Sequence, residues 1–207
     1  ADILDAAGVP YCKGGVMARN AAFRGSLRMW TERVDGWIRR LRPEDLLNVD
    51  IFYDLKPVHG DAALGGALFD HAYARGHAEP AFAKLLGEQI VAGNPFTFLG
   101  GLHLEDGRLD LKMHGLFPIV TAARALAIRH GISRRSTRGR LEGLVGCGIG
   151  GAEELAGLVA AHGVFVALML EQQGKDLEAG IPVSNRVEIA ALSRGRQAEL
   201  KTALKAA

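Results

Sequence analysis

The chain has 207 residues, of which 48% are hydrophobic and 23% are charged, and its formal net charge is +2 at pH 7. This composition is typical of a soluble globular protein with one or two domains. The small net charge gives no electrostatic case for binding nucleic acid or a membrane surface, and the longest apolar run, 164–170, is too short to span a membrane. The two cysteines supply neither a disulfide framework nor a zinc-ligand pattern, so we expect a cytoplasmic location.

Residues 1–60 are predicted to form a small α/β unit. Residues 3–7 have the pattern of the end of a helix, and neither a start Met nor an N-cap precedes them, so we expect the chain to be a fragment of a larger protein. A short strand is expected over 10–17 and a helix over 20–41. The clearest strand is expected over 49–55, ended by the proline that follows. The apolar residues of the predicted helix recur at helical spacing: Leu27, Trp30, Val34, Trp37 and Leu41.

Residues 61–207 are predicted to be helical throughout, so the fold class is mainly α: a helical bundle preceded by the small α/β unit. Ser136 or Thr137 is expected to cap a helix that follows. Residues 146–151 match the letters of the dinucleotide fingerprint G-x-G-x-x-G, but the fingerprint requires a preceding strand, and the preceding residues have a helical pattern. We therefore interpret this stretch as a turn between two helices.

Two carboxylates mark the predicted strand at 49–55. Asp50 and Asp54 are an even number of positions apart, so on a strand they would share one face. Two carboxylates on one face could help to hold Mg²⁺, which prefers oxygen ligands. The alternative is an edge strand whose outer face is wet.

A second group of polar residues precedes the predicted helix after Pro118. Asp110, Lys112 and His114 alternate, so they would project together from an extended segment. Lys and His suit phosphate binding or proton transfer. The alternative is a capped loop with solvated side chains. Among the seven histidines, only His59 and His114 lie near other candidate site residues.

Several segments together resemble one family, the DUF294-type nucleotidyltransferases that are often joined to CBS or cyclic-nucleotide-binding domains. The first part carries 10–20 (PYCKGGVMARN), Phe23, Arg24, Trp30 and 51–61 (IFYDLKPVHGD). The second part carries 110–112 (DLK), 115–119 (GLFPI), Ala123, Arg124 and 136–141 (STRGRL), and it resembles the helical substrate-binding domain of the family. More distantly, the DLK…GL segment is similar to one in PII uridylyltransferases and glutamine synthetase adenylyltransferases.

The resemblance implies a polymerase-β-like site, in which a Gly-Ser loop, an Asp-x-Asp pair and a third carboxylate act with Mg²⁺ on a nucleoside triphosphate. Asp54 would be the third carboxylate and metal ligand in the complete protein, with Asp50 as the second choice. The Gly-Ser loop and the Asp pair are absent from this chain, so by itself it is expected to be inactive. The residues expected to contact substrate or nucleotide are Arg24, Lys56, His59, Asp110, Lys112 and His114.

The resemblance thus implies that residues 1–60 are the end of a nucleotidyltransferase domain and residues 61–207 a substrate-binding domain. The expected reaction transfers a nucleoside monophosphate to a PII-like protein or a small-molecule acceptor. The expected partners include upstream nucleotidyltransferase and regulatory domains, and exposed strand edges in 10–56 would allow a homodimer. The alternative from a different class is a non-catalytic helical module for regulation or protein interaction.

Overall fold

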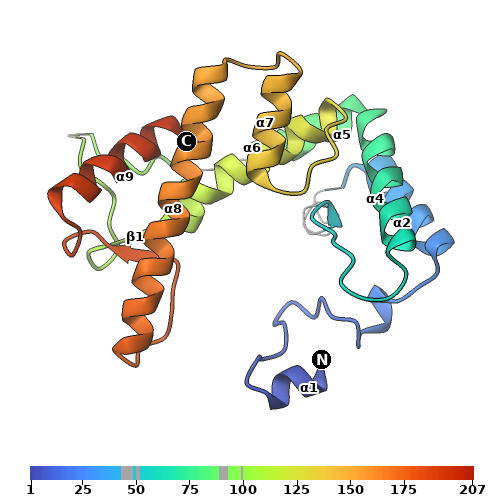
Figure 1. Cartoon of the computed structure of the whole chain (residues 1–207), viewed down its shortest axis with the longest axis horizontal. Helices are drawn as coiled ribbons and strands as arrows, with labels where there is room; N and C mark the ends of the chain where they lie inside the picture. The colour runs from blue at the N-terminus through green and yellow to red at the C-terminus, as the bar shows by residue number, and fades with distance from the viewer. Residues whose placement is uncertain (43–48, 50–51, 89–92, 99) are drawn as a thin grey trace.

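The computed structural model describes every residue except 43–48, 50–51, 89–92 and 99. Within the described residues the chain is mainly α-helical, as the sequence predicts, with eight α-helices and one pair of short strands (Figure 1). The elements are α1 (Asp2–Ala6), η1 (Ala21–Phe23), α2 (Leu27–Arg40), α4 (Ala62–His77), α5 (Pro80–Glu88), β1 (Arg108–Asp110), η2 (Lys112–Leu116), α6 (Phe117–Arg129), α7 (Thr137–Gly146), α8 (Ala152–Glu178), β2 (Arg186–Glu188) and α9 (Arg194–Ala206).

Serine side chains begin three of these helices. The hydroxyl oxygens of Ser26, Ser136 and Ser193 each accept a hydrogen bond from the backbone N–H three residues further on, which satisfies one of the amides that a helix start leaves open. The cap predicted at Ser136 is therefore confirmed. The turn predicted over 146–151 is also confirmed, because it joins the end of α7 to the start of α8.

A cluster of aromatic side chains forms the core around α2 and α4, and we call it the aromatic cluster. Its rings are in edge or stacked contact, with centroids 5.9 Å apart for Trp30 and Phe52 and 5.1 Å apart for Tyr53 and Tyr73. Such offset arrangements add to the stabilisation from burial alone. The principal members of the aromatic cluster are Trp30, Val34, Trp37, Ile38, Phe52, Tyr53, Phe69, Tyr73 and Phe82.

The strands predicted in the first sixty residues are wrong where the structure describes them. Residues 10–17 contain a turn, in which the N–H of Gly15 donates to the carbonyl of Cys12. Val49 and Phe52 are helical, and the N–H of Tyr53 donates to the carbonyl of Val49 at 3.0 Å, so the local backbone satisfies this donor without a neighbouring strand. The α/β character predicted for this unit is therefore not found among the described residues before Gly60.

Two further expectations depended on those strands. Asp54 lies in a turn rather than on a strand face, and Asp50 lies outside the described residues, so the shared face of the two carboxylates has no support. The strand-edge argument for a homodimer through 10–56 has no basis in the described part of this segment. A homodimer stays a prediction, as does a domain boundary near Gly60.

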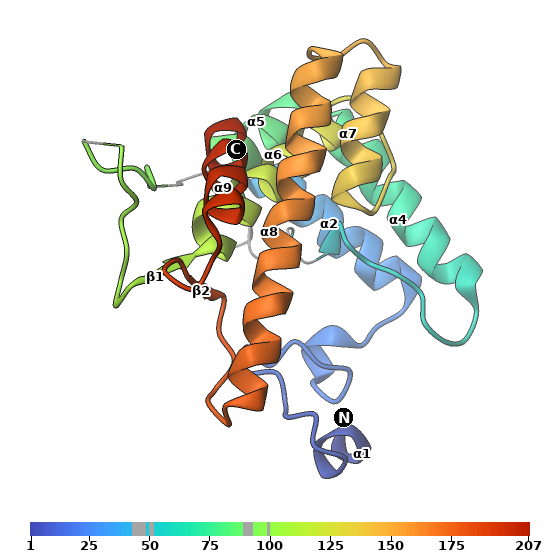
Figure 2. The ribbon, with the colours of Figure 1, turned by 60° about the vertical axis from the view of Figure 1, so that its left-hand side comes forward.

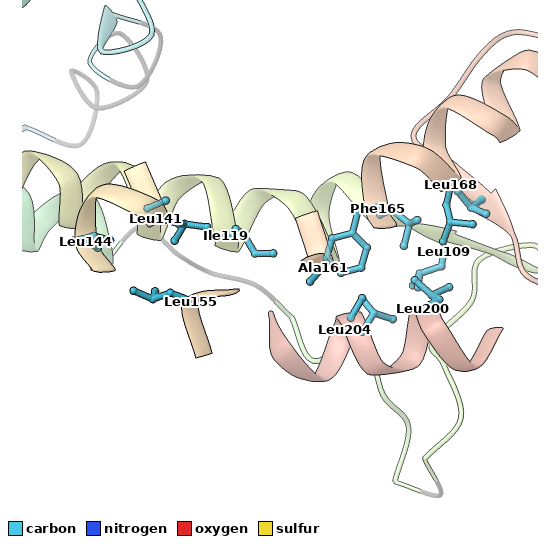
Figure 3. Close-up of a cluster of buried hydrophobic side chains, with 14 of the residues drawn as sticks. Leu109, Ile119, Leu141, Leu144, Leu155, Ala161, Phe165, Leu168, Leu200 and Leu204 are labelled. Carbon is cyan, nitrogen blue, oxygen red and sulfur yellow. The ribbon is translucent and has the colours of Figure 1, made fainter. Parts of the chain in front are cut away.

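The second core lies between α6, α7, α8 and α9 and is mostly aliphatic, and we call it the aliphatic cluster. In Figure 3 the ring of Phe165 lies among Ala161, Leu168 and Leu204. Helix α6 crosses the middle of the molecule in Figure 1 and joins the two cores: it places Ile119 in the aliphatic cluster and Ile128 in the aromatic cluster. The principal members of the aliphatic cluster are Leu109, Leu111, Ile119, Leu141, Leu144, Leu155, Phe165, Leu168, Val187, Leu200 and Leu204.

The strand pair of the described residues belongs to the aliphatic cluster. β1 and β2 are antiparallel, with Leu109 opposite Val187, and they lie beside α8 and α9 in Figure 2. Both of these residues are buried in the aliphatic cluster. The pair thus closes the end of the bundle that is formed by α8 and α9.

Helix α8 is long and apolar enough, by length and composition, to span a membrane. It contacts α7 and α9 and places Leu155, Phe165 and Leu168 in the aliphatic cluster, as the central helix of a bundle does. Only 22% of its most apolar window is buried, so it also presents apolar side chains such as Leu170 outward. The expected absence of a membrane partner stays a prediction.

Candidate functional site

Asp54 is held between two arginines that come from different helices. One carboxylate oxygen accepts a hydrogen bond from Nη2 of Arg124 in α6 at 2.7 Å, and the other accepts one from Nη2 of Arg140 in α7 at 2.7 Å. The two arginine side chains are only 7% and 1% exposed, whereas the Asp54 side chain is 45% exposed. The cluster therefore has a buried cationic base and a carboxylate that reaches the surface.

Arg140 is the most completely bonded member of this cluster. Its Nε donates to the carbonyl of Arg134 at 2.8 Å, and its Nη2 also donates to the carbonyl of Tyr53 at 3.0 Å and to the hydroxyl of Tyr73 at 3.3 Å. A buried guanidinium needs such partners because desolvation of its charge is costly. These bonds fix the turn that carries Asp54 against α7.

Two buried tyrosines complete the base of the site. The Tyr53 hydroxyl donates to the carbonyl of Ala72 at 2.7 Å, and the Tyr73 hydroxyl donates to the carbonyl of Arg134 at 3.1 Å. Burial raises the pKa of Tyr53, and burial also raises the pKa of Tyr73 against the opposing effect of Arg140. Both phenols are thus kept protonated and act as hydrogen-bond donors that hold the backbone in place.

A cavity of about 770 Å³ opens beside this cluster and extends along α7. Lys56 lines it two residues after Asp54, and Arg134 and Arg135 line it from the loop between α6 and α7. We call it the basic cavity. Its lining residues are Lys56, Ser133, Arg134, Arg135, Ser136, Gly139, Glu142, Gly143 and Gly146.

The other residues predicted to contact substrate are not part of this cavity. Arg24 and His59 are exposed in loops. Asp110 ends β1 and accepts a hydrogen bond from the N–H of Met113 at 3.0 Å, and Nδ1 of His114 lies 3.1 Å from the carbonyl oxygen of Gly93. Lys112 is exposed at the start of η2.

The expectation that Asp110, Lys112 and His114 project from one extended segment is wrong. The chain turns into the π-helical η2 immediately after Leu111, because the Asp110 carboxylate caps this turn. The close approach of Gly115 to Phe165 requires a residue without a side chain there: a Cβ at Gly115 would lie 2.7 Å from the Phe165 ring. The three polar residues therefore surround a packed turn.

A magnesium ion does not fit the described residues by themselves. Both oxygens of Asp54 are bonded to guanidinium groups, and within the described part of the chain no group of three His, Cys, Asp or Glu side chains could hold a metal. Asp50 lies outside the described residues. A site containing Asp54 would need ligands that these residues do not supply.

Sequence reasoning did not assign a role to Arg124 or Arg140, although both belong to the segments that carry the family resemblance. Each arginine lies among the apolar residues on the buried side of its helix. A charged side chain at a buried position usually has an oppositely charged or hydrogen-bonding partner, and this is the signal that could have been used. Their shared partner, Asp54, is 70 residues from Arg124 and 86 from Arg140 in the chain, so spacing alone could not reveal it.

Comparison with known families identifies the chain. Residues 80–207 match the family described as "Putative nucleotidyltransferase substrate binding domain", and residues 1–44 match "Putative nucleotidyltransferase DUF294". The chain belongs to the DUF294 nucleotidyltransferase family. No curated protein and no solved structure matches it. Asp54 and Lys56 lie between the two matched ranges, whereas Arg124, Arg134 and Arg140 lie within the substrate-binding domain of the family.

Proposed function

We propose that this chain forms the substrate-binding side of a nucleotidyltransferase active site. The reaction transfers a nucleoside monophosphate from a nucleoside triphosphate to an acceptor, which is a protein of the PII type or a small molecule. The observation that carries the proposal is the attachment of Asp54, through Arg124 and Arg140, to the domain that the family uses for substrate binding. This attachment holds a half-exposed carboxylate two residues before Lys56, which lines the basic cavity.

The charges at this junction suit the chemistry of phosphoryl compounds. Nucleotidyl transfer depends on positioning a highly charged triphosphate and on stabilising the charge that develops at its oxygens. Lys56, Arg134 and Arg135 supply positive charge at the basic cavity. In the proposed site, Asp54 is the third carboxylate of a polymerase-β-like arrangement, and the other carboxylates come from a Gly-Ser and Asp-x-Asp segment outside this sequence.

Mg²⁺ is the cofactor that such a carboxylate set would take, since it prefers oxygen ligands and substrate phosphates. The proposal places the whole protein in the cytoplasm, with an upstream catalytic core and a CBS or cyclic-nucleotide-binding domain as its partners. The acceptor and these partners rest on likeness to the family.

A labelled-nucleotide assay tests the proposal. In the parent protein that includes the catalytic segment, transfer from α-labelled ATP or UTP is expected, and Asp54→Asn is expected to lower the rate by at least about 100-fold, comparable to the loss of one charge-stabilising group. The matched control is Asp70→Asn, because Asp70 is exposed on α4 and does not line the basic cavity. Thermal melting of both variants separates lost chemistry from lost folding.

A second function, a non-catalytic interaction module, is favoured by one feature. A groove of about 320 Å³ between α7 and α8 is lined mostly by apolar side chains, among them Leu141, Val145, Leu155 and Val159. Such a groove suits a hydrophobic segment of another protein. If Asp54→Asn leaves the transfer rate unchanged, the assignment of Asp54 is wrong. If the parent protein transfers neither nucleotide, the interaction module becomes the better reading.

A further inference from the structure

The basic cavity has an excess of positive charge that the described side chains do not neutralise. Lys56, Arg134 and Arg135 line it together with one carboxylate, Glu142. That carboxylate is already paired, because Nε of Arg138 donates to it at 2.7 Å. The ammonium of Lys56 and the guanidinium of Arg134 make no hydrogen bond or ion pair with the part of the chain that the structure describes, so both are available to an anion.

The backbone of Arg134 and the side chain of Arg135 are held in place by their surroundings. The carbonyl of Arg134 accepts hydrogen bonds from the Tyr73 hydroxyl and from Nε of Arg140, which anchors the loop to the buried base of the site. Nε of Arg135 donates to the carbonyl of Leu55 at 2.8 Å, and its guanidinium carbon lies 3.9 Å from the centroid of the Phe69 ring. A preformed arrangement of this kind lowers the ordering cost of binding.

The wall that α7 contributes to the cavity contains three glycines, of which Gly143 is packed against Ile132 and Gly146 has open space around it. Gly139, Gly143 and Gly146 follow one another at intervals of four and three residues, so they share one face of the helix. Ser136 caps the helix with its hydroxyl, which accepts from the N–H of Gly139 at 3.0 Å. The cavity volume of about 770 Å³ lies within the range of small-molecule sites, roughly 300–1,000 Å³.

We propose that the basic cavity binds the polyphosphate chain of a nucleotide, with Lys56, Arg134 and Arg135 as the residues that contact its phosphate oxygens. A guanidinium group can donate two parallel N–H hydrogen bonds to the oxygens of one phosphate. A lysine ammonium adds a point charge on a flexible side chain. The inference deepens the proposed function, on which the choice of a nucleotide rests. The choice of a polyanion rests on the cavity and its charges alone.

Calorimetric titration of this chain tests the inference with four probes: sodium tripolyphosphate, ATP, UTP and citrate. The first three are expected to bind, with an affinity that falls as salt is added. Lys56→Gln and Arg134→Gln are each expected to weaken tripolyphosphate binding by roughly three- to tenfold. Neither side chain has a partner to lose in the described structure, so both variants are expected to fold normally.

Two matched variants sharpen the result. Lys201→Gln makes the same change of charge at an exposed position of α9, outside the cavity, and is expected to leave the affinity unchanged. Glu142→Gln removes the carboxylate from the cavity and releases Arg138, so it is expected to strengthen binding by roughly two- to fivefold. A gain of affinity cannot result from a damaged fold.

The outcomes separate the possible ligands. Equal affinity for tripolyphosphate and ATP supports the inference with recognition confined to the phosphates, and tighter binding of ATP or UTP supports it with contacts to the base or sugar as well. The inference is overturned if no probe binds, if citrate binds as tightly as tripolyphosphate, or if Lys201→Gln weakens binding as much as Arg134→Gln. Because this titration needs no transfer reaction, binding without transfer would contradict only the proposed function.

Discussion

The aromatic and aliphatic clusters differ in what the hydrogen bonds of their buried polar groups connect. In the aromatic cluster, Tyr53 and Tyr73 combine large rings with hydroxyls that bond to the backbone, and the network continues through Arg140 to the half-exposed Asp54. In the aliphatic cluster, the buried amide of Gln172 donates to Asp176 at 2.9 Å, and its oxygen accepts from the N–H of Glu188. The first network reaches the surface at Asp54, whereas the second holds β2 on α8.

This difference assigns separate tasks to the two cores. A residue that links the aromatic cluster to Asp54 should affect both stability and binding, because the same hydrogen bonds hold the fold and shape the cavity. A residue inside the aliphatic cluster should affect stability alone. Variants in the two cores can therefore test this difference.

The largest effect is expected for Arg140→Met. This change removes four hydrogen bonds, which leaves the carbonyl oxygens of Tyr53 and Arg134 without that donor and Asp54 with Arg124 as its remaining partner among the described residues. Loss of one partner from a buried network costs roughly 2–4 kcal/mol of unfolding free energy. Urea unfolding measures this cost, and titration with tripolyphosphate is expected to show weaker binding as well.

The control for this variant is Arg138→Met, which lies on the same helix with its side chain 73% exposed. Its effect on stability should stay within about 0.5 kcal/mol. Equal unfolding free energies for the two variants would show that the buried network around Arg140 does not stabilise the fold, and the distinction between the two cores would then fail.

A smaller effect is expected for Gly115→Ala, at the contact of η2 with α8. The added Cβ would lie 2.7 Å from the ring of Phe165, which is fully buried, so the ring or the helix has to shift. Overpacking of this kind costs roughly 1–3 kcal/mol. Urea unfolding measures the loss, and the affinity for tripolyphosphate is expected to be unchanged, in contrast to Arg140→Met.

Gly163→Ala is the matched control, since a Cβ there meets no atom within 4 Å and the residue lies inside α8. It is expected to stabilise the protein by roughly 0.5–1 kcal/mol through helix propensity. A Gly115→Ala variant as stable as Gly163→Ala would contradict the close packing of η2 on Phe165.

The helical part of the fold was predictable because its signals are local. Ser136 caps α7, glycines separate α7 from α8, and apolar residues repeat at helical spacing along α8 and α9. The strand prediction failed at the described residues of 49–55 because a run of apolar and aromatic residues fits either a strand or a buried helical turn. Here the rings of Trp30 and Trp37 pack on Phe52, and a helical turn at Phe52 satisfies the local backbone.

The candidate site was predictable only in part. Asp54 and Lys56 were recognised by their motif, and the structure places Lys56 on the basic cavity and Asp54 beside it. The partners of Asp54 could not be found, because Arg124 and Arg140 reach it only after α6 and α7 have packed against the aromatic cluster. Local patterns fix helices, but contacts between distant residues build the site.

The smallest effect is expected for the pH dependence of stability that His162 contributes on the aliphatic side. His162, on α8, makes no hydrogen bond or ion pair with the described residues, and burial lowers its pKa below the ordinary value of 6.5. The unfolded chain therefore takes up a proton at this residue at a higher pH than the folded chain does.

Stability should accordingly fall as the pH drops from about 6.5 toward the lowered pKa of His162, and this residue contributes no further change below that value. His162→Gln, which cannot be protonated, is expected to reduce the slope of unfolding free energy against pH in this window. His103→Gln is the control, since His103 is exposed. Urea unfolding at several pH values compares the slopes. Equal slopes for the original chain and His162→Gln would mean that the partial burial of His162 on α8 does not lower its pKa, which would contradict this prediction.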